Sequence, residues 1–123
     1  MLNLETFYVN GIKVLFHQNK SFLTSVQILT NVGSSAEDPS IYGLAHILEH
    51  MFFKGSTKRP GGKAISRAAN DIGGKMNAYT TYDHTVYYIT ILNDKFEEGF
   101  DILADMYQNP IFPAEEFAKE LNP

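Results

Sequence analysis

Residues 45–50 read AHILEH, and this stretch decides how the rest of the chain is interpreted. It places two of the four histidines of the chain four residues apart, with a glutamate directly before the second. On an α-helix, residues at this spacing have Cβ atoms about 5–6 Å apart. Two imidazole nitrogens so placed can bind one zinc ion at the usual ~2.0–2.1 Å. The stretch therefore predicts a helix that carries a metal site.

A helix puts the polar and the apolar residues of this segment on opposite faces. Because a helix turns about 100° per residue, His50 and Glu49 fall at about +40° and −60° from His46. The opposite face carries only apolar residues: Ile41, Leu44, Ile47, Leu48 and Met51. We expect that face to pack on the core. Gly43 falls at about +60° and is expected inside the helix, where it leaves room beside the histidines.

Glu49 directly precedes the second histidine and cannot easily become a third ligand from the same turn. It can instead reach a water molecule activated by the metal and take its proton as a general base. The order of residues is the inverse of the HExxH pattern. The alternative interpretation is a partly exposed helix face with two histidines and a solvated glutamate.

The segments around this helix predict an α+β domain. Asn10-Gly11 is a strong hairpin signal between two β-rich runs within Thr6–Phe16. Further strands are predicted over residues 22–32, 75–81 and 84–92. Helices are predicted over residues 41–54, 63–72, 93–110 and 114–121. Strands grouped between pairs of helices indicate a mixed, mainly antiparallel sheet with the helices packed on one face.

Composition limits the function classes. The 123 residues carry a net charge of −4 without a basic stripe, which argues against nucleic-acid binding. The absence of cysteine excludes disulfides, thiolate metal sites and cysteine nucleophiles. No apolar run approaches the ~20 residues of a membrane span, and the start lacks signal-peptide features, so we expect one cytoplasmic unit over residues 1–123. The basic residues after the motif, Lys54, Lys58 and Arg59, are interpreted as a solvated loop.

Residues 75–81, KMNAYTT, form an unusual predicted strand because they contain almost no aliphatic core residues. Such a strand suits the edge of a sheet, where a peptide can add through main-chain hydrogen bonds. The alternative is an ordinary edge strand whose polarity protects it from aggregation.

Residues 43–60 read GLAHILEHMFFKGSTKRP, and residues 73–88 read GGKMNAYTTYDHTVYY. These two segments resemble the pitrilysin-type, or insulinase-type, zinc metallopeptidases, the inverzincins with the motif H-x-x-E-H. The likeness extends from the Asn10-Gly11 hairpin through residues 33–38, GSSAED, to the last helix. That family includes insulin-degrading enzyme, mitochondrial processing peptidase and smaller bacterial relatives. The resemblance implies the fold of part of one half-domain of such a peptidase.

The resemblance also implies roles for particular residues. In that family the two histidines of the motif bind zinc, the glutamate between them activates water, and an Asn-Ala pair holds the substrate. The corresponding residues here are His46, His50, Glu49, Asn77 and Ala78.

The third zinc ligand of the family is a glutamate roughly two helical turns beyond a supporting acidic residue. Glu120 matches the supporting position, and the position of the ligand would fall just past Pro123. A catalytic zinc normally keeps three protein ligands. We therefore expect an incomplete N-terminal zinc-binding half-domain that is inactive, or nearly so, by itself.

The resembled enzymes are paired homologous half-domains that close around an unfolded peptide. We expect this chain to be a segment of a zinc-dependent endopeptidase, with a peptide as substrate and a second half-domain or homologous subunit as partner. A non-catalytic peptide-binding or assembly subunit of a processing-peptidase-like complex is the alternative. A third possibility is a structural zinc shared with a neighbouring copy, and exposed apolar helix faces are expected to favour a homodimer.

Overall fold

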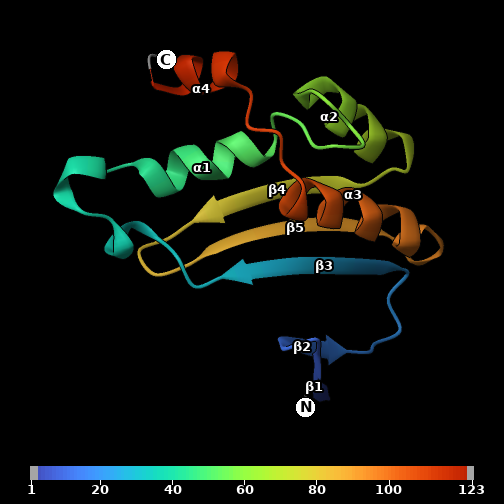
Figure 1. Cartoon of the computed structure of the whole chain (residues 1–123). Coiled ribbons are helices and arrows are strands. Elements are labelled where there is room, and N and C mark those ends of the chain that lie inside the picture. The colour runs from blue at the N-terminus through green and yellow to red at the C-terminus, as the bar shows by residue number, and fades with distance from the viewer. Residues whose placement is uncertain (1–2, 122–123) are drawn as a thin grey trace.

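The strands of the structure form two separate antiparallel sheets (Figure 1). The computed structural model describes residues 3–121. β1 (Leu4–Val9) and β2 (Ile12–His17) form the predicted hairpin around Asn10 and Gly11, which both have positive φ. A three-stranded sheet has the order β3-β5-β4, and its strands are β3 (Leu23–Thr30), β4 (Lys75–Thr80) and β5 (Thr85–Leu92). The sequence predicted a mixed, mainly antiparallel sheet, and the described strands pair antiparallel throughout but form two sheets.

The helices all lie over one face of the three-stranded sheet, as Figure 1 shows. They are α1 (Leu44–Phe52), α2 (Gly62–Asp71), α3 (Phe96–Gln108) and α4 (Ala114–Leu121). The predicted α+β class with helices on one face is thereby confirmed. Within residues 3–121, every helix is too short or too polar to cross a membrane.

The core lies between β5, the central strand, and the helices. Alternate residues of β5 point into it, because successive side chains of a strand face opposite sides. The buried cluster joins three elements and contains Ile65, Tyr87, Ile89, Ile91, Ile102, Leu103 and Met106. Gly99 lets α3 approach β5 closely, since a Cβ at that position would lie 2.5 Å from the Cδ1 atom of Ile91.

The helix of the motif begins later than the sequence predicted. Residues Pro39–Ile41 form a 3-10 turn, and the carboxylate of Asp38 accepts a hydrogen bond from the Ser40 amide at 2.9 Å. Gly43 then adopts a left-handed conformation with φ +88° and is the N-cap of α1. The prediction that Gly43 lies within the helix was wrong. A glycine is needed at this position because φ is positive, a backbone conformation that residues with a side chain rarely adopt.

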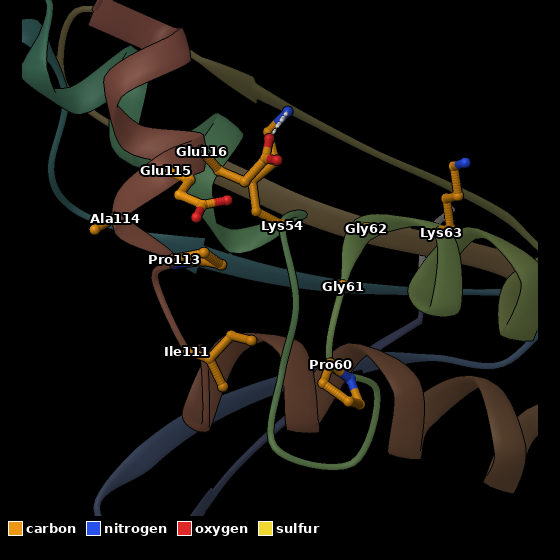
Figure 2. A pocket seen from close by; sticks show the side chains of 10 residues that line it. All are labelled: Lys54, Pro60, Gly61, Gly62, Lys63, Ile111, Pro113, Ala114, Glu115 and Glu116. Atoms are coloured by element: carbon orange, nitrogen blue, oxygen red, sulfur yellow. Dashed lines mark ion pairs between the residues drawn. The ribbon is translucent and has the colours of Figure 1, made fainter.

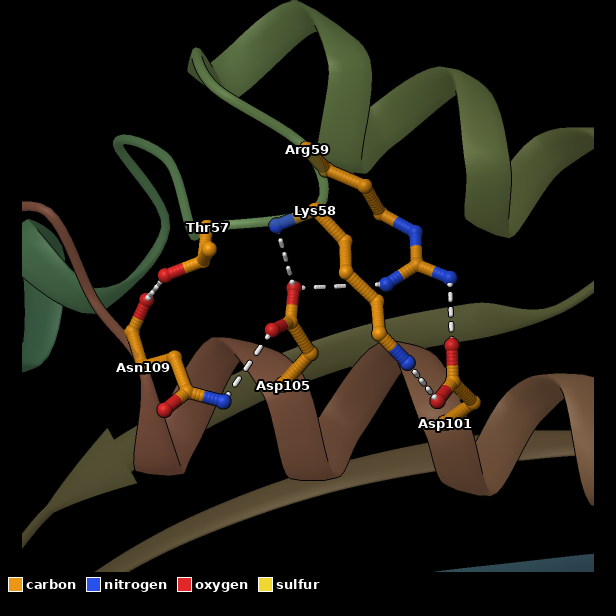
Figure 3. A network of polar contacts seen from close by, with 6 residues as sticks. All are labelled: Thr57, Lys58, Arg59, Asp101, Asp105 and Asn109. Carbon is orange, nitrogen blue, oxygen red and sulfur yellow. Dashed lines mark hydrogen bonds and ion pairs between the residues drawn. The ribbon is translucent and has the colours of Figure 1, made fainter.

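The loop between α1 and α2 runs down to α3 and back. With the start of α4 it borders a hollow of about 780 Å³, in which Lys54 forms an ion pair with Glu116 at 3.6 Å (Figure 2). Figure 3 shows how this loop is attached to α3. The Arg59 guanidinium contacts Asp101 at 2.8 Å and Asp105 at 3.5 Å, and the Lys58 ammonium contacts Asp101 at 2.7 Å. The prediction of a solvated basic loop therefore holds for Lys58, whose side chain is 59% exposed, and was wrong for Lys54 and Arg59, at 29% and 19%.

Asp105 is the buried member of this network, with an exposed fraction of 4%. Burial opposes the ionisation of its carboxyl group, but the polar groups around it prevail and lower its pKa below the usual 3.8. These groups include the side-chain amide of Asn109, which donates at 3.3 Å, and the backbone amide of Lys58, which donates at 3.2 Å. The ionised carboxylate therefore connects the loop to α3.

We predict that Asp105→Asn lowers the free energy of unfolding at neutral pH by roughly 1–3 kcal/mol, because buried donors lose their charged acceptor. Since the pKa of Asp105 is lowered by folding, its stabilisation is present above 3.8 and is lost as the pH falls through the lowered value. The difference between wild type and variant should accordingly shrink in acid. Urea unfolding at neutral and at acidic pH measures this difference, with Asp71→Asn as control, because Asp71 is exposed and lies outside the network. An unchanged free energy of unfolding at neutral pH would contradict the prediction.

Candidate metal centre

α1 packs on the sheet through the face that carries Glu49. Glu49 is only 7% exposed, whereas Leu44 and Leu48 are 39% and 40% exposed. The sequence-based expectation that the aliphatic face would meet the core was therefore wrong, although Met51 is buried. The hydroxyl group of Thr80, on β4, donates a hydrogen bond to the Glu49 carboxylate, and this tertiary contact offsets part of the cost of burying it.

His46, Glu49 and His50 come together as a potential metal site. Their ligand atoms all lie within 4.8 Å of one another. The two imidazole rings are 4.3 Å apart between centroids, at an interplanar angle of 67°. The two imidazoles are donors that zinc accepts, and the Glu49 carboxylate lies close enough to act on a water molecule beside the ion. The residues present therefore fit a zinc ion.

Tyr87 lies under this site, on β5. Burial raises the pKa of its phenol, and the negative charge of Glu49 raises it further. Tyr87 is therefore a neutral phenol at physiological pH. Neither Thr80 nor Tyr87 was singled out for the site from the sequence, because both belong to strands that the sequence could not place under α1.

Glu120 reaches the site from α4. Its Oε2 atom lies 2.8 Å from Nδ1 of His50, and its Oε1 atom lies 3.2 Å from the Lys54 ammonium. The hydrogen bonds from His50 and then Lys54 hold the pKa of Glu120 below its usual range, so the carboxyl group is ionised. An Nδ1–H group that donates to a carboxylate leaves Nε2 of the ring as a free acceptor. Asn122 and Pro123, which follow this helix turn, lie outside the described residues.

Asn77 and Ala78 lie on β4, which is an edge strand. Within residues 3–121, β4 pairs with β5 alone. The amide of Ala78 donates to the side-chain oxygen of Asn77 at 2.8 Å. Asn77 also lines a hollow of about 850 Å³, together with Glu49, His50 and residues of α2. One recess is thus lined by Asn77 of the predicted peptide-binding strand and by Glu49 and His50 of the potential metal site.

The comparisons with known proteins identify the family. Residues 13–122 match the family model described as insulinase, peptidase family M16. An uncharacterized zinc protease of Rickettsia felis is 44% identical over 113 residues, which cover 90% of this chain and 27% of that protein. The mitochondrial-processing peptidase subunit beta of Dictyostelium discoideum is 40% identical over 103 residues, which cover 84% of this chain and 22% of that subunit.

A solved structure has the same fold as this chain. The crystal structure of a protease from Helicobacter pylori matches this chain with a TM-score of 0.91 and 26% identity, over 98% of this chain and 29% of that one. The chain therefore spans roughly a quarter of the length of these three proteins. The resemblance drawn from the two sequence segments is confirmed, and this chain belongs to the insulinase family of peptidases, family M16.

Proposed function

We propose that this chain is the zinc-binding segment of a metallopeptidase that hydrolyses extended peptides, with Glu49 as the general base. The observation that carries the proposal is the convergence of the His46, Glu49 and His50 ligand atoms within 4.8 Å. It is supported by membership of a peptidase family and by a relative named as a zinc protease.

His46 and His50 would hold the metal. When bound, zinc supplies Lewis-acid chemistry, since it lowers the pKa of water and polarises a carbonyl group. Glu49 would take the proton of the attacking water and pass it to the leaving amine. Its burial and the hydrogen bond from Thr80 hold the carboxylate in one orientation. Glu120, hydrogen-bonded to His50, would fix the orientation of that ring, as carboxylates often do for metal-bound histidines.

The substrate would bind along the free edge of β4. An extended peptide adds to an edge strand through main-chain hydrogen bonds. The Ala78 amide is available for such a bond once the side chain of Asn77 moves aside, because that side chain is its present acceptor. The adjoining hollow of about 850 Å³ has room for side chains of the peptide.

Hydrolysis would need more than this segment. A catalytic zinc normally has three protein ligands. This segment would supply His46 and His50, because Glu49 is proposed to act as the base. We propose that a further ligand and a second half-domain, or a homologous subunit, complete the site. The exposed Leu44 and Leu48 of α1 would give such a partner an apolar surface to cover. A non-catalytic assembly subunit would use the same surfaces but would have no use for Glu49.

The first test is the zinc content of the purified chain. We predict about one zinc per chain, as in a mononuclear site, and its loss in His50→Ala, because one of two imidazole ligands is removed. His84→Ala is the matched control, since His84 pairs with Asp83 and is not part of the cluster. Elemental analysis after dialysis measures the content. Equal zinc in the His50 and His84 variants would refute the proposed site.

The second test separates a peptidase from an assembly subunit. We predict that Glu49→Gln keeps the zinc but lowers the hydrolysis of an extended peptide by roughly 100-fold or more, the usual contribution of a general base. The assay uses this segment together with the partner that completes the site, and Glu115→Gln serves as the control on the surface of α4. Full activity of the Glu49 variant would rule out its role as base.

The third test concerns the edge strand. We predict that Ala78→Pro weakens the binding of an extended peptide about three- to ten-fold, the equivalent of one hydrogen bond, because proline removes the amide donor. Proline is tolerated on an edge strand when its position faces away from the neighbouring strand. Ala78→Gly keeps the donor and should bind like the wild type. Fluorescence anisotropy with a labelled peptide measures the affinity, and equal affinities of the two variants would contradict peptide addition at Ala78.

A further inference from the structure

α1 begins without a cap from its own residues. The first backbone N–H groups of a helix have no partner within the helix, and an N-cap side chain usually supplies one. The N-cap of α1 is Gly43, which has no side chain, and the first turn contains no acidic residue. The start of the helix that carries the metal-site residues therefore depends on another part of the chain.

Glu37 supplies the missing hydrogen-bond acceptors. Its Oε2 atom accepts a hydrogen bond from the Gly43 amide at 2.7 Å, and its Oε1 atom accepts one from the Ala45 amide at 2.8 Å. Both carboxylate oxygens are thus used on the same helix start, and the side chain is half-buried. Glu37 stands six residues before Gly43, which is outside the three-residue spacing of a capping box.

His46 directly follows Ala45 and lies in the first turn of α1. Its side chain is exposed, and the ring that it contacts is that of His50. The place of His46 is therefore set by the backbone of this turn. Fraying of the turn would move His46 away from Glu49 and His50, which lie further along the helix.

The negative charge of Glu37, like its hydrogen bonds, favours a metal ion at the start of α1. The N-terminus of a helix carries about half a positive charge, which opposes a metal dication held in the first turn. The Glu37 carboxylate lies on the amides that carry this charge and offsets it.

We infer that Glu37 is a positioning residue of the metal site: it fixes the start of α1 and thereby places His46 for metal binding. The inference rests on the proposed zinc site and adds to it a residue that the motif does not contain. Glu37 touches neither metal nor substrate in this role.

The experiment compares Glu37→Ala and Glu37→Gln with Asp38→Ala in the 123-residue chain. Asp38 is the matched control, because its carboxylate also accepts a backbone amide but at the preceding 3-10 turn. Zinc affinity is measured by competition with a chromogenic chelator, and hydrogen exchange reports the protection of the Ala45 amide. We expect Glu37→Ala to bind zinc roughly ten-fold more weakly, as for other indirect supports of metal ligands, and to lose the protection of Ala45. Glu37→Gln retains an acceptor oxygen and should recover part of the affinity, and Asp38→Ala should match the wild type.

The inference is overturned if Glu37→Ala keeps wild-type zinc affinity, if the Ala45 amide stays protected in it, or if Asp38→Ala loses as much affinity. Absence of zinc from the wild type would refute the proposed function instead. In that case, loss of Ala45 protection confined to the Glu37 variants would still support the positioning of the helix start, and unchanged protection would overturn it.

Discussion

The buried carboxylate of Glu49 is the constraint on which the rest of the site depends. A charged group can be buried only where hydrogen bonds replace its contacts with water. Thr80 provides such a bond from β4, where the Glu49 face of α1 meets the sheet. His50, which follows Glu49 on the helix, lines the recess beside the free strand edge, and the ring of His46 lies against that of His50. The apolar residues on the other side of α1 become exposed because the Glu49 face meets the sheet.

Contacts between distant segments hold this arrangement in place. α4 is connected to α1 through the pairs that Glu120 makes with His50 and Lys54. The loop after α1 is attached to α3 by Arg59 and by the buried Asp105. Together these contacts fix the C-terminal end of α1 and the loop that follows it. The apolar surfaces that remain exposed, on α1 and on the two-stranded hairpin, suit the partner half-domain of the proposed function, since an isolated hairpin is marginally stable in water.

The sequence predicted the elements well and their orientation less well. The Asn10-Gly11 turn, the strands and all four helices were expected close to where they occur, because turn chemistry and hydrophobic period are local properties. The predicted helix began too early. Ile41 belongs to the 3-10 turn before Gly43, but its spacing from Leu44 and Leu48 is the same as on a helix. The buried face of α1 was predicted wrongly, because the usual rule assigns the aliphatic side to the core and does not foresee a partner for a carboxylate.

The sequence by itself therefore determined the H-x-x-E-H motif, the edge character of β4 and the fold class, because each follows from residues close together in sequence. Only the tertiary structure decided which groups surround the motif. Thr80 is 31 positions from Glu49 and Glu120 is 70 positions from His50. Glu37 acts across a turn that no short pattern describes. Such contacts depend on how the helices lie on the sheet, and hydrogen-bond distance between remote side chains exists only after that packing has formed.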